Sequence, residues 1–129
     1  ISMEEKIAFW STLCYTFLIT GMMIGFGLLF QKRPPKNINN LYGYRTRMSM
    51  KNEKTWVFAH QYAGRIWFYS GIAGLCFSVI TLFCFRHSSC FETVSAILMI
   101  AQLILLIGVI WPTERALRRT FDSFGNLKK

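Results

Sequence analysis

Three long stretches of the chain contain no aspartate, glutamate, lysine or arginine. They are residues 7–30, 66–85 and 93–113, which are 24, 20 and 21 residues long. A helix rises about 1.5 Å per residue and the hydrocarbon core of a bilayer is about 30 Å thick, so each stretch is long enough to cross a membrane. The chain is also 53% hydrophobic and only 16% charged, unlike most soluble proteins. We therefore predict an integral membrane protein.

The three stretches predict one all-α domain over residues 1–129. We expect transmembrane helices at about residues 7–30, 55–85 and 91–112, with a loop at 31–54 and a tail at 113–129. The loop mixes bulky residues with turn formers, so we expect it to be ordered. Leu117, Phe121 and Phe124 give the tail an apolar stripe, which predicts an amphipathic helix lying on the membrane or on the loop. Because Met3 can begin a chain and Ile1 cannot, we expect the natural start at Met3.

Lysines and arginines are distributed unevenly around the predicted spans. Of 15, twelve follow the first or third span, whereas Lys6 and Arg86 lie on the opposite side and Arg65 lies at the membrane edge. Such cations gather on the cytoplasmic side, so we expect the N-terminus outside and the loop and C-terminus inside. The same cations predict contact with anionic lipid headgroups. Since no nucleic-acid-binding motif accompanies them, we do not expect direct nucleic-acid binding.

Glycines mark the faces on which the helices are expected to pack. Gly21 and Gly25 form a GxxxG pattern in the first span, and Gly71 and Gly74 lie on one face of the second. Small residues let two helices approach closely in lipid. We expect Gly21 and Gly25 to pack against another span of the same chain, and association of two copies is the alternative. Gln102 is expected to form a hydrogen bond between helices.

The loop and the start of the second helix hold the candidate site. Asn52 is the expected N-cap of that helix. Two guanidinium groups and one imidazole could bind an anion and transfer a proton, so the candidate residues are Tyr44, Arg45, Trp56, His60 and Arg65. In the alternative reading the arginines reach lipid phosphates and His60 only packs between helices. The spacing alone leaves both readings open.

The chain lacks the cysteine and histidine spacing of a metal site. Its four cysteines form no CxxC pair, and no nucleophile elbow or phosphate-binding loop is present. We therefore expect no metal, no cofactor and no catalytic residues. Whether Cys84 and Cys90 pair stays open at this point.

The loop and the start of the second helix also carry a recognisable combination of residues. Asn40, Gly43-Tyr44-Arg45-Thr46, Trp56 and His60 resemble the signature of the SdpI family of bacterial multipass membrane proteins, with Ser49, Asn52 and Gly64 alongside. Glu114, Leu117, Phe121 and Gly125 add to the resemblance with less force. It extends over nearly the whole chain and includes the layout of three spans. The resemblance implies a bacterial plasma-membrane protein whose functional motif is this loop.

The namesake of that family is an immunity protein against a secreted, membrane-active toxin. It also holds a cytosolic repressor at the membrane when toxin is present. The resemblance thus implies toxin resistance by binding, with a peptide toxin and a cytosolic repressor as partners. The alternatives are a lipid-directed enzyme that uses His60, Arg45 and Arg65, and a small transporter that would need oligomers. We expect the loop to fold onto the second helix and to bring Arg45 toward Trp56 and His60.

Overall fold

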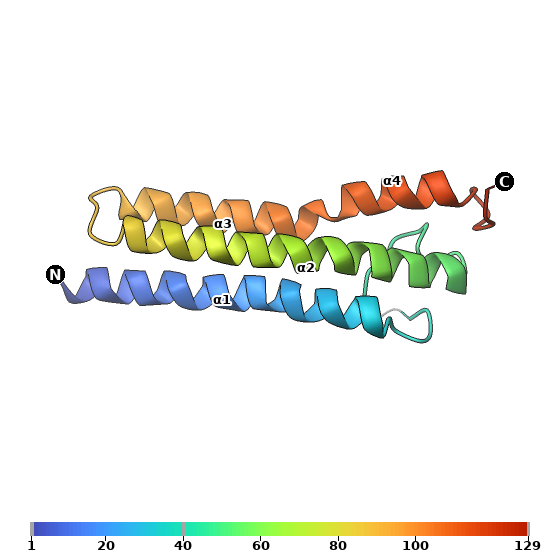
Figure 1. Cartoon of the computed structure of the whole chain (residues 1–129), viewed down its shortest axis with the longest axis horizontal. Coiled ribbons are helices and arrows are strands. Elements are labelled where there is room, and N and C mark those ends of the chain that lie inside the picture. The colour runs from blue at the N-terminus through green and yellow to red at the C-terminus, as the bar shows by residue number, and fades with distance from the viewer. Residues whose placement is uncertain (1, 40, 129) are drawn as a thin grey trace.

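The computed structural model describes residues 2–39 and 41–128, and within them the regular structure is helical. The helices are α1 (Met3–Lys32), α2 (Glu53–Cys84), α3 (Phe91–Gly108) and α4 (Ile110–Thr120). Figure 1 shows α1, α2 and the succession of α3 and α4 side by side, with the two termini at opposite ends. Three segments are long and apolar enough to span a membrane, namely residues 3–32, 53–84 and 91–120. The prediction of an all-α chain with three such helices is confirmed.

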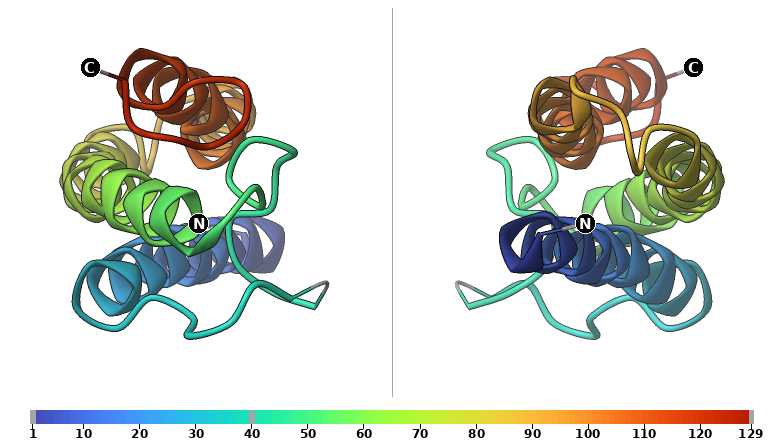
Figure 2. Two further views of the ribbon diagram at one scale, coloured as in Figure 1. Left: turned by 90° about the vertical axis from the view of Figure 1, so that its right-hand side faces the viewer. Right: turned by 90° about the vertical axis from the view of Figure 1, so that its left-hand side faces the viewer.

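One end of the bundle extends beyond the length that a membrane requires. α2 has 32 residues, which corresponds to about 48 Å against about 30 Å of hydrocarbon. At the end where α2 begins, the structure also holds the segment between α1 and α2, the helix α4 and the last residues (Figure 1). We call this the loop end, and the opposite end, at residues 85–90, the turn end. The two views of Figure 2 show α2 between α1 and the α3–α4 pair, with the segment between α1 and α2 beside α2 at the loop end.

The closest helix contact joins the backbones of α1 and α2 at Gly27 and Gly64. A Cβ atom on Gly27 would lie 2.7 Å from the carbonyl oxygen of Gly64 and 2.6 Å from the backbone nitrogen of Phe68. A Cβ atom on Gly64 would in turn lie 2.7 Å from the carbonyl oxygen of Gly27. In lipid, where no water is released between helices, such close packing is a main source of helix association. These two glycines therefore fix the register of α1 against α2.

The internal packing expected of Gly21 and Gly25 is wrong. A Cβ atom at either position would meet nothing within 4 Å, so this GxxxG face points out of the bundle. Gly21 and Gly25 are one helical turn apart and share one face of α1, whereas the face that contacts α2 carries Gly27. Gly71 does pack inside, since its Cβ would lie 2.8 Å from a side-chain carbon of Ile24. Gly74 packs more loosely, with its nearest neighbour, a Leu105 methyl, at 3.3 Å.

A buried polar contact joins all three spans near their middle. Gln102 of α3 donates from Nε2 to Thr16 Oγ1 of α1 and to Ser78 Oγ of α2, both at 3.1 Å. All three side chains are buried. The interhelical hydrogen bond expected of Gln102 is thus confirmed. Because polar groups have no water partners in hydrocarbon, this contact fixes α3 in one position along the other two helices.

The third predicted helix ends earlier than expected. Regular α3 stops at Gly108, and α4 starts at Ile110, two residues before Pro112. A proline has no N–H group and its ring clashes with the carbonyl four residues before it, so Pro112 disrupts the helical bond to Gly108. Val109 keeps helical backbone angles. α4 therefore continues toward the loop end rather than turning away (Figure 1).

The apolar stripe predicted for the tail is only partly helical, because α4 ends at Thr120 and Phe121 and Phe124 lie beyond it. Leu117 and Phe121 are buried with Tyr44 and the α2 alanines Ala59 and Ala63 in one core cluster. Of the two surfaces expected for this stripe, the structure selects the loop and α2 for these side chains. Phe124, by contrast, is 81% exposed.

A smaller core closes the turn end. It contains Phe9, Leu82, Phe91 and Leu98, and the guanidinium of Arg86 lies 4.4 Å from the ring centre of Phe9. The cysteines of the chain, Cys84 and Cys90 among them, are free thiols.

The glycine contact yields a matched pair of substitutions. Gly27→Ala should place a methyl group against backbone atoms of α2 and lower the free energy of unfolding by about 3 kcal/mol. Gly25→Ala, two residues away on the outer face, should leave stability unchanged. Thermal unfolding of both variants in detergent micelles would measure this. Equal stability of the two variants would contradict the assigned register of α1 and α2.

Candidate functional site

His60 lies at the centre of the loop end and is fully buried. Its Nε2 accepts the backbone N–H of Tyr44 at 2.9 Å, and its Nδ1 lies 2.8 Å from the carbonyl oxygen of Trp56. A backbone N–H can only donate, so Nε2 must be the unprotonated nitrogen. The proton therefore sits on Nδ1 and is donated to Trp56. His60 is a neutral imidazole with a fixed tautomer, and both of its nitrogens are in use.

Gly43 brings the loop backbone against this imidazole. Its φ angle is +106°, and a Cβ atom would lie 2.5 Å from His60 Nε2. Both facts require glycine, because a side chain would be strained by the φ angle and would clash with the ring. The contact that the sequence suggested between the loop and α2 is thus made by the backbone of Gly43 and Tyr44.

The side chain of Tyr44 connects the loop to α4. It is buried, and its hydroxyl donates to Glu114 Oε1 at 2.7 Å. Burial, together with the neighbouring Glu114 carboxylate, raises the pKa of Tyr44 well above its ordinary value. The hydroxyl therefore remains protonated and continues to donate. Through one residue, the loop is bonded to α2 by its backbone and to α4 by its side chain.

Ser49 and Thr46 close the turn that follows Tyr44. Ser49 Oγ donates to the Tyr44 carbonyl at 3.0 Å and accepts the Thr46 N–H at 2.8 Å. The Ser49 N–H donates in return to Thr46 Oγ1 at 3.2 Å. Ser49 is fully buried. These bonds satisfy polar groups that would otherwise be buried without partners, so the turn has one stable conformation.

Asn52 caps α2 as predicted and also reaches the C-terminal turn. Its side-chain oxygen accepts the Thr55 N–H at 2.9 Å, and Thr55 Oγ1 accepts the Asn52 N–H at 3.0 Å, which forms a reciprocal capping box. The Asn52 amide then donates to the carbonyl of Gly125 at 2.7 Å. Gly125 has a φ angle of +86°, so its place against Asn52 requires glycine.

Trp56 joins α2 to the end of α1. The indole is fully buried, and its Nε1 donates to the carbonyl of Pro35 at 2.8 Å. Its ring centre lies 4.3 Å from that of His60, and the ring of Phe30 meets His60 edge-on at 4.9 Å. His60 is therefore enclosed by two aromatic rings and the loop backbone.

Tyr44, Trp56 and His60 fall within a region that matches known proteins. A family model described as the SdpI/YfhL protein family matches residues 36–113. The chain belongs to the SdpI/YfhL family. A similar relative is the "Uncharacterized protein YfhL" of Bacillus subtilis (strain 168), which is 46% identical over 57 residues. That alignment covers 43% of this chain and 52% of the relative, so the chain spans about half of the relative's length. No solved structure matches.

The SdpI/YfhL match includes both partners of the bond between Tyr44 and His60. Further contacts of the site lie partly outside it, including the bond of Tyr44 to Glu114. Pro35 precedes the matched residues and bonds Trp56, and Gly125 follows them and bonds Asn52. The segments beyond the family match thus complete the loop end rather than standing apart from it.

The candidate residues divide into a buried group and an exposed group. Tyr44, Trp56 and His60 are brought together, whereas the side chains of Arg45 and Arg65 are exposed. Asn40 lies outside the described residues. Sequence reasoning did not identify Pro35 and Thr55 as site residues. It named Glu114 only through the family resemblance and did not predict its contact with Tyr44. The only available signal for Thr55 was its position three residues after the N-cap Asn52.

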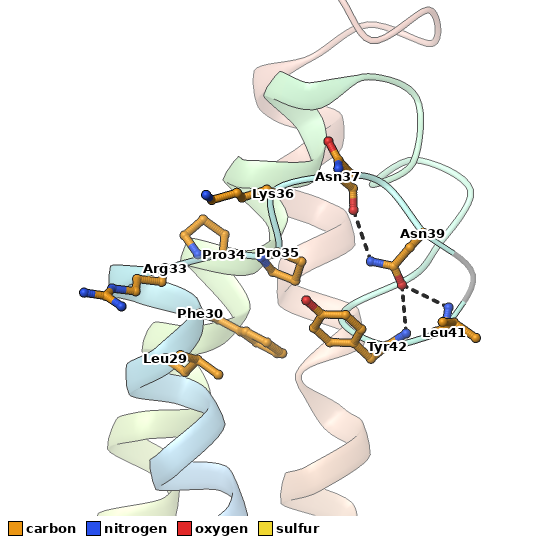
Figure 3. Close-up of a pocket in the computed structure, with 10 residues that line it drawn as sticks. All are labelled: Leu29, Phe30, Arg33, Pro34, Pro35, Lys36, Asn37, Asn39, Leu41 and Tyr42. Atoms are coloured by element: carbon orange, nitrogen blue, oxygen red, sulfur yellow. Dashed lines mark hydrogen bonds between the residues drawn. The ribbon is translucent and has the colours of Figure 1, made fainter.

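A cavity of about 540 Å³ lies beside the loop at the end of α1. Figure 3 shows Phe30, Pro35 and Tyr42 turned toward one another, with Arg33 and Lys36 directed away from the loop. Asn39 shapes the loop side, since its Oδ1 accepts the N–H groups of Leu41 and Tyr42, each at 2.9 Å. The lining is thus mostly apolar on the side that faces Tyr42, with the two cations on the opposite side.

The bonds of His60 predict the effect of its removal. His60→Ala should leave the buried Tyr44 N–H without an acceptor, a loss of about 1–3 kcal/mol. Hydrogen exchange at Tyr44, measured by mass spectrometry, should accelerate about tenfold or more. His60→Gln should restore part of the protection, because its amide oxygen can replace Nε2 as the acceptor.

His87→Ala is the matched control, since that histidine is exposed at the turn end. It should leave exchange at Tyr44 unchanged. Unchanged exchange in His60→Ala as well would mean that the imidazole does not hold the loop.

Proposed function

We propose that this chain is a membrane immunity protein that confers resistance to a secreted, membrane-active peptide toxin by binding. The observation that supports this most directly is the state of His60, whose two ring nitrogens are both engaged, Nε2 by the loop backbone at Tyr44 and Nδ1 by the Trp56 carbonyl within α2. The site therefore offers a rigid recognition surface rather than a reactive group. Membership of the SdpI/YfhL family and the loop's resemblance to SdpI immunity proteins support the same function.

The geometry gives less support to a lipid-directed enzyme. Such an enzyme would need His60 to exchange a proton with a substrate, but His60 is fully buried and has no free nitrogen. Arg45 and Arg65 are exposed, whereas the imidazole is fully buried. A transporter would require a path between several copies of the chain, with the outward Gly21 and Gly25 face as the candidate contact between them. Binding is the function that these contacts favour.

Arg45 is our candidate contact residue on the exposed side of the loop. Its neighbours Gly43, Tyr44 and Ser49 fix the backbone on which it stands. A guanidinium on a rigid support can bind a carboxylate or phosphate in a defined geometry, which a lysine cannot reproduce. The partner is the toxin itself or, in a signalling role at the cytoplasmic face, a cytosolic repressor.

Survival of toxin-sensitive cells tests this function. Cells that express the wild-type chain should survive a secreted peptide toxin of this class with unchanged lipid composition. Arg45→Ala and Arg45→Lys should both lose most of the protection, because neither retains the planar fork. Lys54→Ala, which removes an exposed cation from the first turn of α2, should retain it.

Protein amounts in the membrane must be equal for this comparison. A lipid species that appears or disappears with expression would favour the enzyme instead. Full protection by Arg45→Lys would mean that Arg45 contributes only its positive charge and not the planar shape of its guanidinium.

We also propose that the loop end faces the cytoplasm and the N-terminus lies outside. Twelve of the 15 lysines and arginines belong to the loop and the C-terminal tail. Cys90 is an exposed, free thiol at the turn end and serves as a built-in reporter.

A membrane-impermeant maleimide should label Cys90 in intact cells, and Cys90→Ser should remove that signal. Ser123→Cys, placed in the Cys90→Ser background, should react only after the cells are permeabilised, because Ser123 is exposed in the C-terminal turn. Labelling of Ser123→Cys in intact cells would reverse the proposed orientation.

A further inference from the structure

A second pocket, on α4, is separate from the loop cavity and has a different chemical character. Its volume is about 750 Å³, and it lies across the boundary of α3 and α4. One side is apolar and exposed, with Ile107, Ile110 and Trp111 at 61%, 45% and 69%. The other side is cationic. We call this pocket the α4 basic cup, lined on its cationic side by Arg115, Arg118, Arg119 and Lys128.

The helix and the tail each contribute to this concentration of charge. Arg115, Arg118 and Arg119 are spaced by three and four residues, so they share one helical face. Lys128 comes from the end of the chain and is returned to α4 by a tight turn. Its N–H donates to the carbonyl of Thr120 at 3.0 Å, and Phe121 pairs with Leu127. The backbone therefore places a fourth cation beside three that the helix already presents.

The cup has little internal compensation for these charges. Among its lining residues the acidic one is Glu114, and Glu114 accepts the hydroxyl of Tyr44 from the loop side. The apolar face of α4 is already buried through Ala116 and Leu117, which leaves the cationic face outward. Like charges at these spacings repel one another. An anion bound in the cup would relieve that repulsion.

Membrane topology alone accounts for cations at this end but not for this arrangement. The positive-inside rule concerns how many lysines and arginines follow a span, and it has no preference for a concave site. Here the cations adjoin the last apolar residues of the third span. Trp111 marks the transition, with the Arg115 guanidinium 5.4 Å from its ring centre. Tryptophan favours the depth of the lipid headgroups.

We propose that the α4 basic cup binds an anionic phospholipid, with a preference for a headgroup that carries two phosphates. The phosphates lie between the arginines and Lys128, where guanidinium forks bind them in pairs. The first part of an acyl chain lies against Ile107 and Trp111. The cup has four cations, and its one carboxylate, that of Glu114, already accepts a hydrogen bond from Tyr44. This excess of positive charge favours a headgroup with two phosphates over one with a single phosphate. This proposal does not rest on the toxin-resistance function.

Lipid binding to the purified full chain tests the proposal. Native mass spectrometry in a mild detergent would titrate cardiolipin, which carries two phosphates, against phosphatidylglycerol and phosphatidylcholine. We expect affinity to fall in that order. The double substitution Arg118→Gln/Arg119→Gln should weaken cardiolipin binding roughly tenfold or more. Lys128→Gln alone should weaken it by a smaller factor.

The control is Lys32→Gln/Lys54→Gln, which removes two exposed cations from the same end of the molecule but outside the cup. It should change cardiolipin affinity less than twofold. All variants change exposed side chains, and equal melting temperatures would confirm that each is folded. Equal losses from the two double variants, or equal affinity for the three lipids, would overturn the proposal in favour of non-specific charge attraction.

Discussion

The hydrogen bond from the Tyr44 backbone to His60 Nε2 is the interaction on which the loop end depends. It fixes the imidazole tautomer, and Nδ1 is thereby committed to Trp56. Tyr44 then carries the connection to α4 through Glu114. Because His60, Trp56 and Tyr44 are buried, an unmade bond among them would be costly, so these contacts support one another. A loop between two membrane helices thereby becomes part of a packed core.

The loop end in turn depends on how the helices meet within the membrane. Gly27 and Gly64 let α1 approach α2 until their backbones touch, and this places Phe30 and Pro35 beside His60 and Trp56. Further along, Gln102 holds α3 to both helices by polar bonds that have no water to compete with them. Glycine packing and one amide therefore hold together the helices from which the loop end is built.

Two surfaces with different properties result at the same end of the molecule. The loop is held by hydrogen bonds to His60 and Trp56 of α2, whereas its Arg45 side chain is exposed. The α4 basic cup is an outward concentration of positive charge beside the last apolar turn of the third span. Since Glu114 contacts Tyr44 and also lines the cup, the two surfaces share one residue. The recognition and the lipid binding that we propose would be coupled through α4.

The sequence by itself determined the class of the protein, the three spans and the N-cap of α2, because charge-free length and local capping depend only on neighbouring residues. It also pointed to the loop and to His60. Only the tertiary structure decided that Gly27, rather than Gly21 and Gly25, faces α2, since every side of a membrane helix is apolar and periodicity cannot choose between them. Likewise, the pairing of Trp56 with Pro35 and of Tyr44 with Glu114 joins residues far apart in the chain. Such contacts follow from helix packing, which no local pattern records.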